Sequence, residues 1–328
     1  MIKILCLREV PEHVNEGIDK HCNALYSLFK DDSEIEILPI RNAEGVSYIK
    51  QLSNRQYYKW NGLKNTIENS GCDIVHIHGF ASFLAVQAII IAKLCKKKVI
   101  YTAHYHPIET LDNPMVGRLF YYLLLKPVLH FVDAFIALNN EDRKVIGKHI
   151  RRVFQIPHWM RLKAKDISLS EKKPNMILFV GRNKGNKGVD HLLQLPKNKY
   201  EIHCVCGDSY IDRDDFILHH DISNEELSDL YAKASLLVVP SKYEAFSLVA
   251  LEAFMHRTPV LMSDRVRIAD YLNGCSGYTI FKYGDYEAFN RAIDTAKEQI
   301  VDVKSIVERF DPIRIKHMYI NAYKSLLY

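Results

Sequence analysis

Short apolar runs alternate with segments of helical periodicity along the whole chain. Eleven runs have the length of a β-strand, from IKILCL at residues 2–7 and DIVHIHG at 73–79 to LLVVPS at 236–241 and GYTIF at 277–281. Strands that are apolar throughout and separated by helices are typical of parallel sheets covered on both faces. The pattern predicts an α/β fold built of doubly wound parallel sheets.

The strand pattern starts afresh in the middle of the chain. A polar stretch, RLKAKDISLSEKKPN, leads into MILFVGR at residues 176–182, which reads as the first strand of a new sheet. We therefore predict a linker near 157–174 between two domains, at 1–157 and 158–310, with a ligand cleft between them. The last segment, 311–328, has helical spacing and no strand after it, so its apolar side is expected to pack on a domain already built. The members of that side are Ile315, Met318, Tyr319, Ala322 and Leu326.

Composition places the chain among ordinary globular proteins. Hydrophobic residues make up 48% and charged residues 25%, and no apolar run reaches the length of a membrane span. The start, MIKILCLREV, lacks signal-peptide features and the seven cysteines form no C-x-x-C pair, so a reducing cytoplasmic location is expected. The net charge of +5 gathers in KLCKKK at 93–98 and RKVIGKHIRR at 143–152. These are either solvated faces or contacts for an anionic membrane or a phosphate-bearing acceptor, and no nucleic-acid module is indicated.

The stretch YEAFSLVALEAFM at residues 243–255 places a carboxylate, Glu252, among apolar neighbours. A loop follows the strand LLVVPS, Ser247 is a plausible N-cap, and the N-terminus of the next helix suits a phosphate. An ionised carboxylate that is buried needs a donor. For Glu252 this is either an Arg or Lys inside the protein or the two hydroxyls of a ribose. Glu244, eight residues earlier, could reach the other end of the same ligand.

A second loop of interest is LFVGRNKGNKGVDHL at residues 178–192. A strand runs into a glycine-rich loop that carries Arg182, Lys184 and Lys187, and a helix starts near Gly188. Glycines allow close backbone approach, and cations on a loop meet phosphate oxygens. The loop is neither a P-loop nor a G-x-G-x-x-G motif. A surface turn with solvated lysines is the alternative when the loop is taken alone. Beside the first stretch, the loop suggests the other wall of a nucleotide diphosphate site.

These two stretches, together with DIVHIHG and VIYTAHYHP, resemble the retaining glycosyltransferases of family 4. That family has the GT-B fold, in which two Rossmann-like domains face each other and a C-terminal helix crosses back to the first domain. The resemblance covers nearly the whole chain. It implies that Arg182 and Lys187 hold the donor diphosphate, Glu252 binds the ribose and Glu244 faces the donor sugar. It also implies that backbone N–H groups hold phosphate and sugar, at Phe246, Ser247 and Leu248.

In the first domain the resemblance points to Gly17 and His104. Gly17, in NEGIDKHCNAL, matches a glycine-rich loop near the point of sugar transfer, and His104 matches a histidine that contacts the transferred sugar. The candidate catalytic residues are therefore Glu244, His104, Arg182 and Lys187. Histidines 76, 78 and 106 are more typical of structural residues, and an H-x-H pair falls short of a zinc site. The resemblance implies no metal and no other cofactor.

The implied reaction moves a hexosyl or N-acetylhexosaminyl group from a nucleotide sugar to a saccharide or lipid-linked saccharide of a bacterial surface polysaccharide, such as lipopolysaccharide or capsule. A UDP-sugar is favoured and GDP-mannose is the alternative. Val266 and Arg267 replace a glycine pair usual in the family, which leaves the base and the sugar of the donor open. The segment PMVGRLFYYLLLKPVL at 114–129 is either a buried helix or a contact with the inner membrane. Two rivals stay open: a UDP-sugar epimerase of related fold, and a non-catalytic partner in a glycosylation complex.

Overall fold

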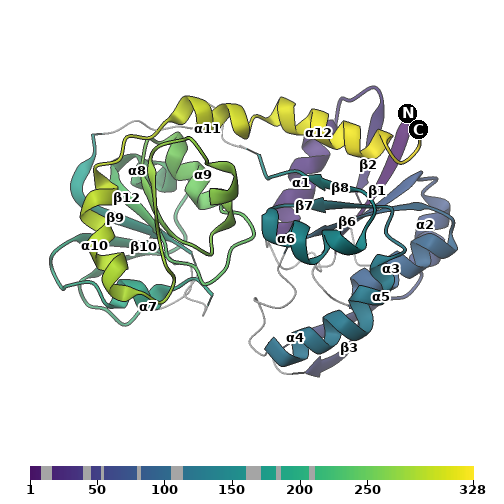
Figure 1. The fold of residues 1–328 in the computed structure, drawn as a ribbon, viewed down its shortest axis with the longest axis horizontal. Helices are drawn as coiled ribbons and strands as arrows, with labels where there is room; N and C mark the ends of the chain where they lie inside the picture. Colours follow the sequence, from purple (N-terminus) through teal and green to yellow (C-terminus); the bar gives the residue numbers. More distant parts are fainter. Residues whose placement is uncertain are drawn as a thin grey trace. The chain divides into compact units, whose positions relative to one another are not determined.

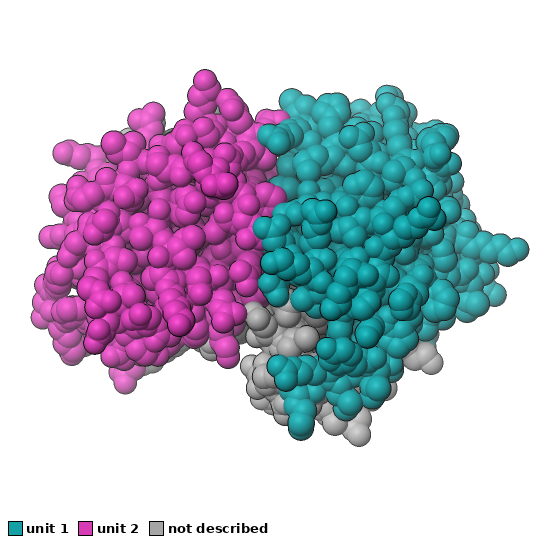
Figure 2. Space-filling model, in the orientation of Figure 1, with its two compact units in different colours: residues 1–158, 312–328 teal, residues 159–311 magenta. Residues whose placement is uncertain are grey.

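The computed structural model describes residues 1–8, 17–39, 46–52, 55–79, 83–104, 114–159, 171–181, 186–206 and 211–328. The chain folds into two compact units (Figure 2). Unit 1 is Met1–His158 with Pro312–Tyr328, and unit 2 is Trp159–Asp311. The chain thus changes unit between 158 and 159 and between 311 and 312, where the sequence suggested boundaries after 157 and 310. Each unit holds a six-stranded parallel sheet with flanking helices, which confirms the predicted α/β fold.

The sheet of unit 1 has the strand order β2-β1-β5-β6-β7-β8. Its strands are β1 (Ile2–Arg8), β2 (Ile35–Pro39), β5 (Ile74–Gly79), β6 (Lys98–Ala103), β7 (Ala134–Ala137) and β8 (Val153–Gln155). Its helices are α1 (Gly17–Phe29), α2 (Leu63–Asn69), α3 (Phe83–Leu94), α4 (Pro114–Phe120), a π-helical turn (Tyr121–Leu125), α5 (Lys126–Leu129), α6 (Asn140–Val145) and α12 (Pro312–Lys324). None of the described helices is long and apolar enough to cross a bilayer.

Helices cover both faces of this sheet (Figure 1). On one face Leu5, Leu7 and Ile77 pack with apolar residues of α2, α3 and α5. The other face carries buried polar side chains, including His76 and His78, because side chains alternate between the two faces of a strand. There α1 and α12 lie side by side (Figure 1). This polar face is the side on which the C-terminal helix packs.

The sheet of unit 2 has the order β11-β10-β9-β12-β13-β14. Its strands are β9 (Lys173–Val180), β10 (Glu201–Val205), β11 (Phe216–His219), β12 (Ala234–Val239), β13 (Val260–Ser263) and β14 (Tyr278–Phe281). Its helices are α7 (Val189–Leu193), α8 (Asn224–Lys233), α9 (Leu248–Met255), α10 (Tyr286–Lys297) and α11 (Val303–Arg309). The first strand of this unit lies in the middle of its sheet, beside the fourth, which is the doubly wound order with a switch point between β9 and β12.

Three strands escape the sequence analysis. β3 (Val46–Leu52) and β4 (Arg55–Trp60) form an antiparallel hairpin outside both large sheets. Their sequence mixes Lys, Gln and Arg with tyrosines, so no apolar run marks them. β11 is missed because its four residues, FILH, run directly into the polar segment HDIS.

The C-terminal helix is anchored on unit 1 by packing and by polar contacts. Four of the five residues expected on its apolar side are buried, and Met318 is half-buried. The expected side omits Tyr323, which is fully buried and whose hydroxyl lies 2.9 Å from Nδ1 of His76. Nε2 of His76 lies 2.8 Å from Oγ1 of Thr102, so both ring nitrogens are engaged. Lys316 pairs with Asp32 at 2.8 Å, which ties the helix to the end of α1.

We predict that unit 1 loses stability in mild acid through His76. Burial, and next the proximity of His104, lowers the pKa of His76 to about 3. His76 takes up a proton near pH 6.5 in the unfolded chain but not in the folded chain. Its contribution to the free energy of unfolding is therefore complete above pH 6.5 and is lost as the pH falls towards 3. At about pH 5 the loss is about 2 kcal/mol relative to pH 8. Urea denaturation at both pH values should show a smaller pH effect in His76→Gln. The same change at the exposed His317 should leave the pH effect intact, and an equal effect in all three proteins would contradict the prediction.

Candidate active site

The candidate site of unit 2 lies at the carboxyl ends of the strands, at the switch point. β9 and β12 are parallel neighbours in the sheet, so the loops that follow them start at the same edge. The first loop leads to α7 and the second, residues 240–247, leads to α9. Residues 182–185 of the first loop, including Arg182 and Lys184, lie outside the described residues. The described residues of both loops include Lys187, Glu244, Phe246 and Ser247, and the candidates Leu248 and Glu252 follow in α9.

Gly188 fixes the first loop on the second. Its backbone is left-handed, with φ of 71°, and a Cβ at this position would lie 1.7 Å from the carbonyl oxygen of Pro240. Only glycine tolerates both conditions. A second tie is the backbone hydrogen bond of 2.8 Å in which the N–H of Lys242 donates to the carbonyl of Asn186. The two loops therefore touch backbone to backbone.

A third loop, after β13, holds the backbone of Glu244. The N–H of Glu244 donates to the carbonyl of Arg265 at 3.1 Å, and the N–H of Arg267 donates to the carbonyl of Glu244 at 3.0 Å. These bonds form an isolated parallel bridge opposite Val266, which is buried. The position of Glu244 is therefore set by loops from two adjacent strands.

The side chains of Lys187 and Glu244 form an ion pair across the first two loops, through Nζ and Oε1. The pair is partly buried, with side-chain exposures of 28% and 15%. The second carboxylate oxygen of Glu244, Oε2, is buried and receives no hydrogen bond from the described part of the chain. A buried acceptor without a donor costs about 1–3 kcal/mol, so this oxygen is suited to a donor brought by a ligand.

The helix α9 begins at this loop as expected. Ser247 is its N-cap, and the hydroxyl accepts a hydrogen bond of 3.4 Å from the N–H of Ala250. The first N–H groups of a helix have no partner within the helix and attract anions. The ring of Phe246 is buried against Phe310, with centroids 5.5 Å apart, and Leu248 is half-buried. The side chain of Phe246 thus anchors the loop, which leaves only its backbone for a ligand.

Glu252 has a partner of a different kind from those considered on the sequence. The hydroxyl of Tyr231 in α8 donates a hydrogen bond of 3.0 Å to Oε2 of Glu252. Burial, and then the charge of Glu252, raises the pKa of Tyr231 well above its usual value, so the phenol keeps its proton. Glu252 itself is half-buried. This hydrogen bond orients the carboxylate of Glu252, and carboxylate oxygens accept hydrogen bonds from hydroxyls.

His104 lies in unit 1, at the end of β6, in a cluster of histidines. Its Nε2 lies 3.2 Å from Nδ1 of His78, and the ring is 8% exposed. Nδ1 of His21 lies 2.7 Å from Nδ1 of His158, and Nε2 of His21 lies 3.4 Å from the hydroxyl of Tyr319. Burial, followed by the neighbouring histidines, lowers the pKa of His78 well below its usual value. Gly17 is the first residue of α1, the helix that carries His21.

The same cluster brings together ligand atoms that could hold a metal ion. Those of His21, His78 and His104 lie within 4.8 Å of one another, and so do those of Cys6, Cys22 and His78. Imidazole and thiolate are the usual zinc ligands. Sequence reasoning saw only the H-x-H pair, because the other ligands come from β1, α1 and β6. The expectation that the reaction needs no metal stays an expectation.

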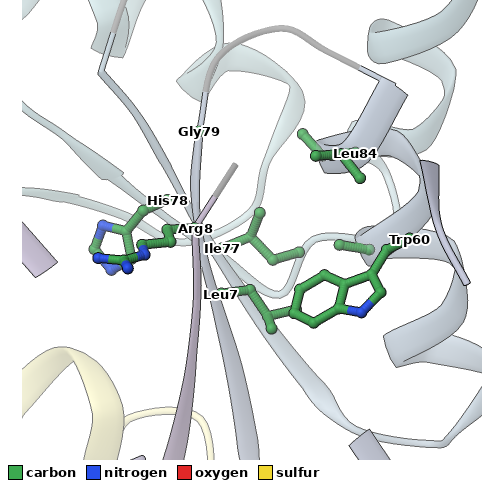
Figure 3. A pocket seen from close by; sticks show the side chains of 9 residues that line it. Leu7, Arg8, Trp60, Ile77, His78, Gly79 and Leu84 are labelled. Carbon is green, nitrogen blue, oxygen red and sulfur yellow. The ribbon is translucent and has the colours of Figure 1, made fainter. Parts of the chain in front are cut away.

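A small apolar recess lies on the opposite face of the same strands, where β1 and β5 meet. Figure 3 shows Leu7, Ile77, Trp60 and Leu84 around it, while Arg8 and His78 extend together to the other side of the strands. β1 and β5 are the switch point of unit 1, because the strand order reverses there. His78 belongs to the switch-point strand β5, while His104 follows the neighbouring strand β6.

Two family models match consecutive parts of the chain. Glycosyltransferase Family 4 matches residues 29–160, and Glycosyl transferases group 1 matches residues 160–305. The chain is a glycosyltransferase of the GT-B type.

Curated relatives of this glycosyltransferase are similar over most of its length. An uncharacterized 41.2 kDa protein in the cps region of Klebsiella pneumoniae is 27% identical over 256 residues, which cover 70% of this chain and 70% of the relative. The O-antigen chain mannosyltransferase RfbU of Salmonella typhimurium is 25% identical over 296 residues, which cover 79% and 82%.

Solved structures of low identity share the fold of this glycosyltransferase. Sucrose-phosphate synthase from Thermosynechococcus elongatus has a TM-score of 0.71 at 16% identity, with 100% of this chain and 99% of that chain covered. Anabaena HepE, in complex with UDP and glucose, has a TM-score of 0.65 at 13% identity, with 99% and 100% covered. At this identity the similarity establishes the fold alone.

We predict that Gly188→Ala is far more destabilising than Gly284→Ala. Both residues have a left-handed backbone, but nothing lies within 4 Å of a Cβ at Gly284. The Gly284 variant should lose about 1–2 kcal/mol for the backbone conformation alone. The Gly188 variant should lose about 4 kcal/mol or more, because the carbonyl of Pro240 must also move. Thermal unfolding of the two variants measures the difference, and equal losses would show that the two loops do not touch as described.

Proposed function

We propose that the glycosyltransferase moves a sugar from a nucleoside diphosphate sugar to a hydroxyl of a saccharide or lipid-linked saccharide, with retention of the anomeric configuration. The sugar is a hexosyl or N-acetylhexosaminyl group, carried by UDP or, as the alternative, as GDP-mannose. Assignment to surface polysaccharide synthesis draws on two relatives, one named for its cps region and one for the O-antigen chain. In this proposal the reaction takes place at the cytoplasmic face of the membrane.

The observation that carries the proposal is the unsatisfied oxygen of Glu244. Oε1 pairs with Lys187, while Oε2 is buried with no donor among the described residues. A sugar hydroxyl at this point supplies the missing hydrogen bond, and a hydroxyl–carboxylate bond is of the stronger, charge-assisted kind. The ammonium of Lys187 has three N–H groups, so it can contact a phosphate oxygen without leaving Glu244.

Charge develops on the diphosphate when the bond to the sugar breaks. Lys187 and the N-terminus of α9 lie on adjoining loops, and both favour an anion. Arg182 belongs to the same loop of the sequence as Lys187 and is assigned to the diphosphate with it. In this proposal the backbone N–H groups at Phe246, Ser247 and Leu248 contribute to the same site.

The nucleoside end of the donor is assigned to Glu252. Tyr231 orients this carboxylate, and two adjacent ribose hydroxyls can donate to it. In unit 1, His104 and Gly17 are assigned to the transferred sugar and the acceptor side. His104 is held by His78 and is still slightly exposed at the end of its strand. The proposed reaction uses these side chains and no metal.

A thermal-shift panel of UDP, GDP, ADP and their sugar conjugates tests the donor site. One nucleotide should raise the Tm of the wild-type chain, since a ligand stabilises the state to which it binds. In Glu252→Gln the affinity for that nucleotide should fall about tenfold or more, because a neutral amide replaces a charged acceptor. Glu287→Gln, at an exposed glutamate of α10, is the matched control and should bind as wild type. If no nucleotide shifts the Tm, the transferase proposal fails, and a non-catalytic partner in a glycosylation complex becomes the favoured alternative.

Glu244→Gln separates catalysis from nucleotide binding. We expect kcat to fall about 10²–10³-fold while the nucleoside diphosphate still binds, because Glu244 faces the sugar and not the nucleoside. The rate is measured as release of nucleoside diphosphate in the presence of acceptor, and NMR of the product reports the anomeric configuration. Conversion of the donor sugar without any acceptor would instead identify an epimerase. An unchanged kcat would remove Glu244 from the reaction.

A further inference from the structure

Unit 1 carries an exposed apolar surface on one long helical rod. α4, the π-helical turn and α5 continue one another without a break (Figure 1). The inner side of the rod is packed into the core through Tyr121, Leu125 and Leu129. Its outer side carries four large apolar side chains that are each more than half exposed: Met115, Leu119, Tyr122 and Leu123. Spacings of three and four residues keep such side chains on one side of a helix.

The neighbouring helix α3 extends this surface. The ring of Phe83, at the start of α3, lies 5.5 Å from the ring of Phe120 in α4. Phe83, Ile90 and Leu94 are exposed, and their spacings of seven and four residues place them on one side of α3. Apolar side chains scattered singly over a surface are ordinary, whereas a contiguous group marks an interaction site.

The helical segments that form this surface carry basic residues only, while acidic residues lie at its edge: Asp133 pairs with Lys93, and Oε1 of Glu68 lies 4.0 Å from Sγ of Cys95. No aspartate or glutamate occurs in residues 83–98 or 114–132, while both segments contain basic residues. Arg118 is exposed on the rod beside Leu119. Nζ of Lys126 lies 5.5 Å from the ring centre of Tyr122, so its charge is held at the edge of the apolar row. We call the set Met115, Arg118, Leu119, Tyr122, Leu123 and Lys126 the outer face.

These charges favour a lipid surface over a second copy of the chain. A twofold contact would bring the outer face against itself, with Arg118 and Lys126 opposite like charges and no carboxylate in the segment to pair them. Anionic headgroups neutralise the same two cations, and the acyl boundary accepts the apolar side chains. A helix with cations beside exposed leucines and an aromatic residue is the arrangement that lies in a bilayer interface.

We propose that the outer face docks unit 1 on an anionic bilayer surface, with Arg118 and Lys126 on the lipid phosphates and Leu119 and Leu123 inserted at the acyl boundary. Only the role of the docking rests on the proposed function, because the docking would bring the enzyme to a lipid-linked acceptor. The docking itself requires neither donor nor acceptor. Its failure can therefore be told apart from failure of the proposed reaction.

Flotation of the purified chain with lipid vesicles tests the docking. Vesicles of phosphatidylcholine with phosphatidylglycerol should bind the chain, and pure phosphatidylcholine vesicles should bind it much less. Leu119→Ser with Leu123→Ser should weaken partition about tenfold or more, since two leucines lose their buried area. Arg118→Ser with Lys126→Ser should weaken partition to anionic vesicles about fivefold for each cation and remove its salt dependence. Ile300→Ser with Lys304→Ser, an exposed apolar and basic pair in unit 2, is the matched control.

The outcomes are distinct. Loss of vesicle binding in both outer-face variants, with the control and the nucleotide thermal shift unchanged, supports the docking. Wild-type vesicle binding in the outer-face variants overturns it. Sedimentation velocity tests whether a second copy of the chain binds the outer face. A wild-type dimer that becomes a monomer in the leucine variant, together with no vesicle binding, would show that it does and would also overturn the proposal.

Discussion

The approach of Gly188 to the carbonyl of Pro240 is the constraint on which the candidate donor site depends. Parallel strands that are far apart in the chain, β9 and β12, become neighbours in the sheet, and their loops meet only if one of them lacks a Cβ. Once the backbones touch, the residue before the glycine, Lys187, is within reach of Glu244 on the other loop. Glu244 in turn is held by the loop after β13, so three loops act as one rigid wall.

The two units meet different chemical demands. A diphosphate that gains charge needs cations and helix N-termini, and unit 2 places Lys187 and the start of α9 on adjoining loops. In unit 1, burial lowers the pKa of His76 and of His78, so both rings stay neutral near pH 7. The ring of His76 is held by Tyr323 and Thr102, so it fixes the C-terminal helix on the sheet.

Much of the fold was predictable from the sequence because its buried strands are apolar over their whole length. IKILCL and LLVVPS can form little else between helical segments, and the restart at MILFVGR marks the second sheet. The hairpin β3–β4 and the short strand β11 were missed because a strand whose sequence mixes polar with apolar residues, or that has four residues only, leaves no continuous apolar run. Tyr323 was missed because its hydroxyl, and not its hydrophobicity, fixes it on His76.

The candidate site was predictable only where its residues are close in the chain. Glu244, Ser247 and Glu252 share one loop and helix, and the loop of Lys187 is marked by glycines. The partner of Glu252 could not be found that way, because a charge argument searches for Arg or Lys and the donor is the neutral phenol of Tyr231. The histidine cluster could not be predicted from the sequence either. Its members come from separate elements and are brought together by the packing of α1 on the sheet: His21, His78, His104 and His158. What sequence spacing reveals is local, and the groups that orient the local residues come from the tertiary fold.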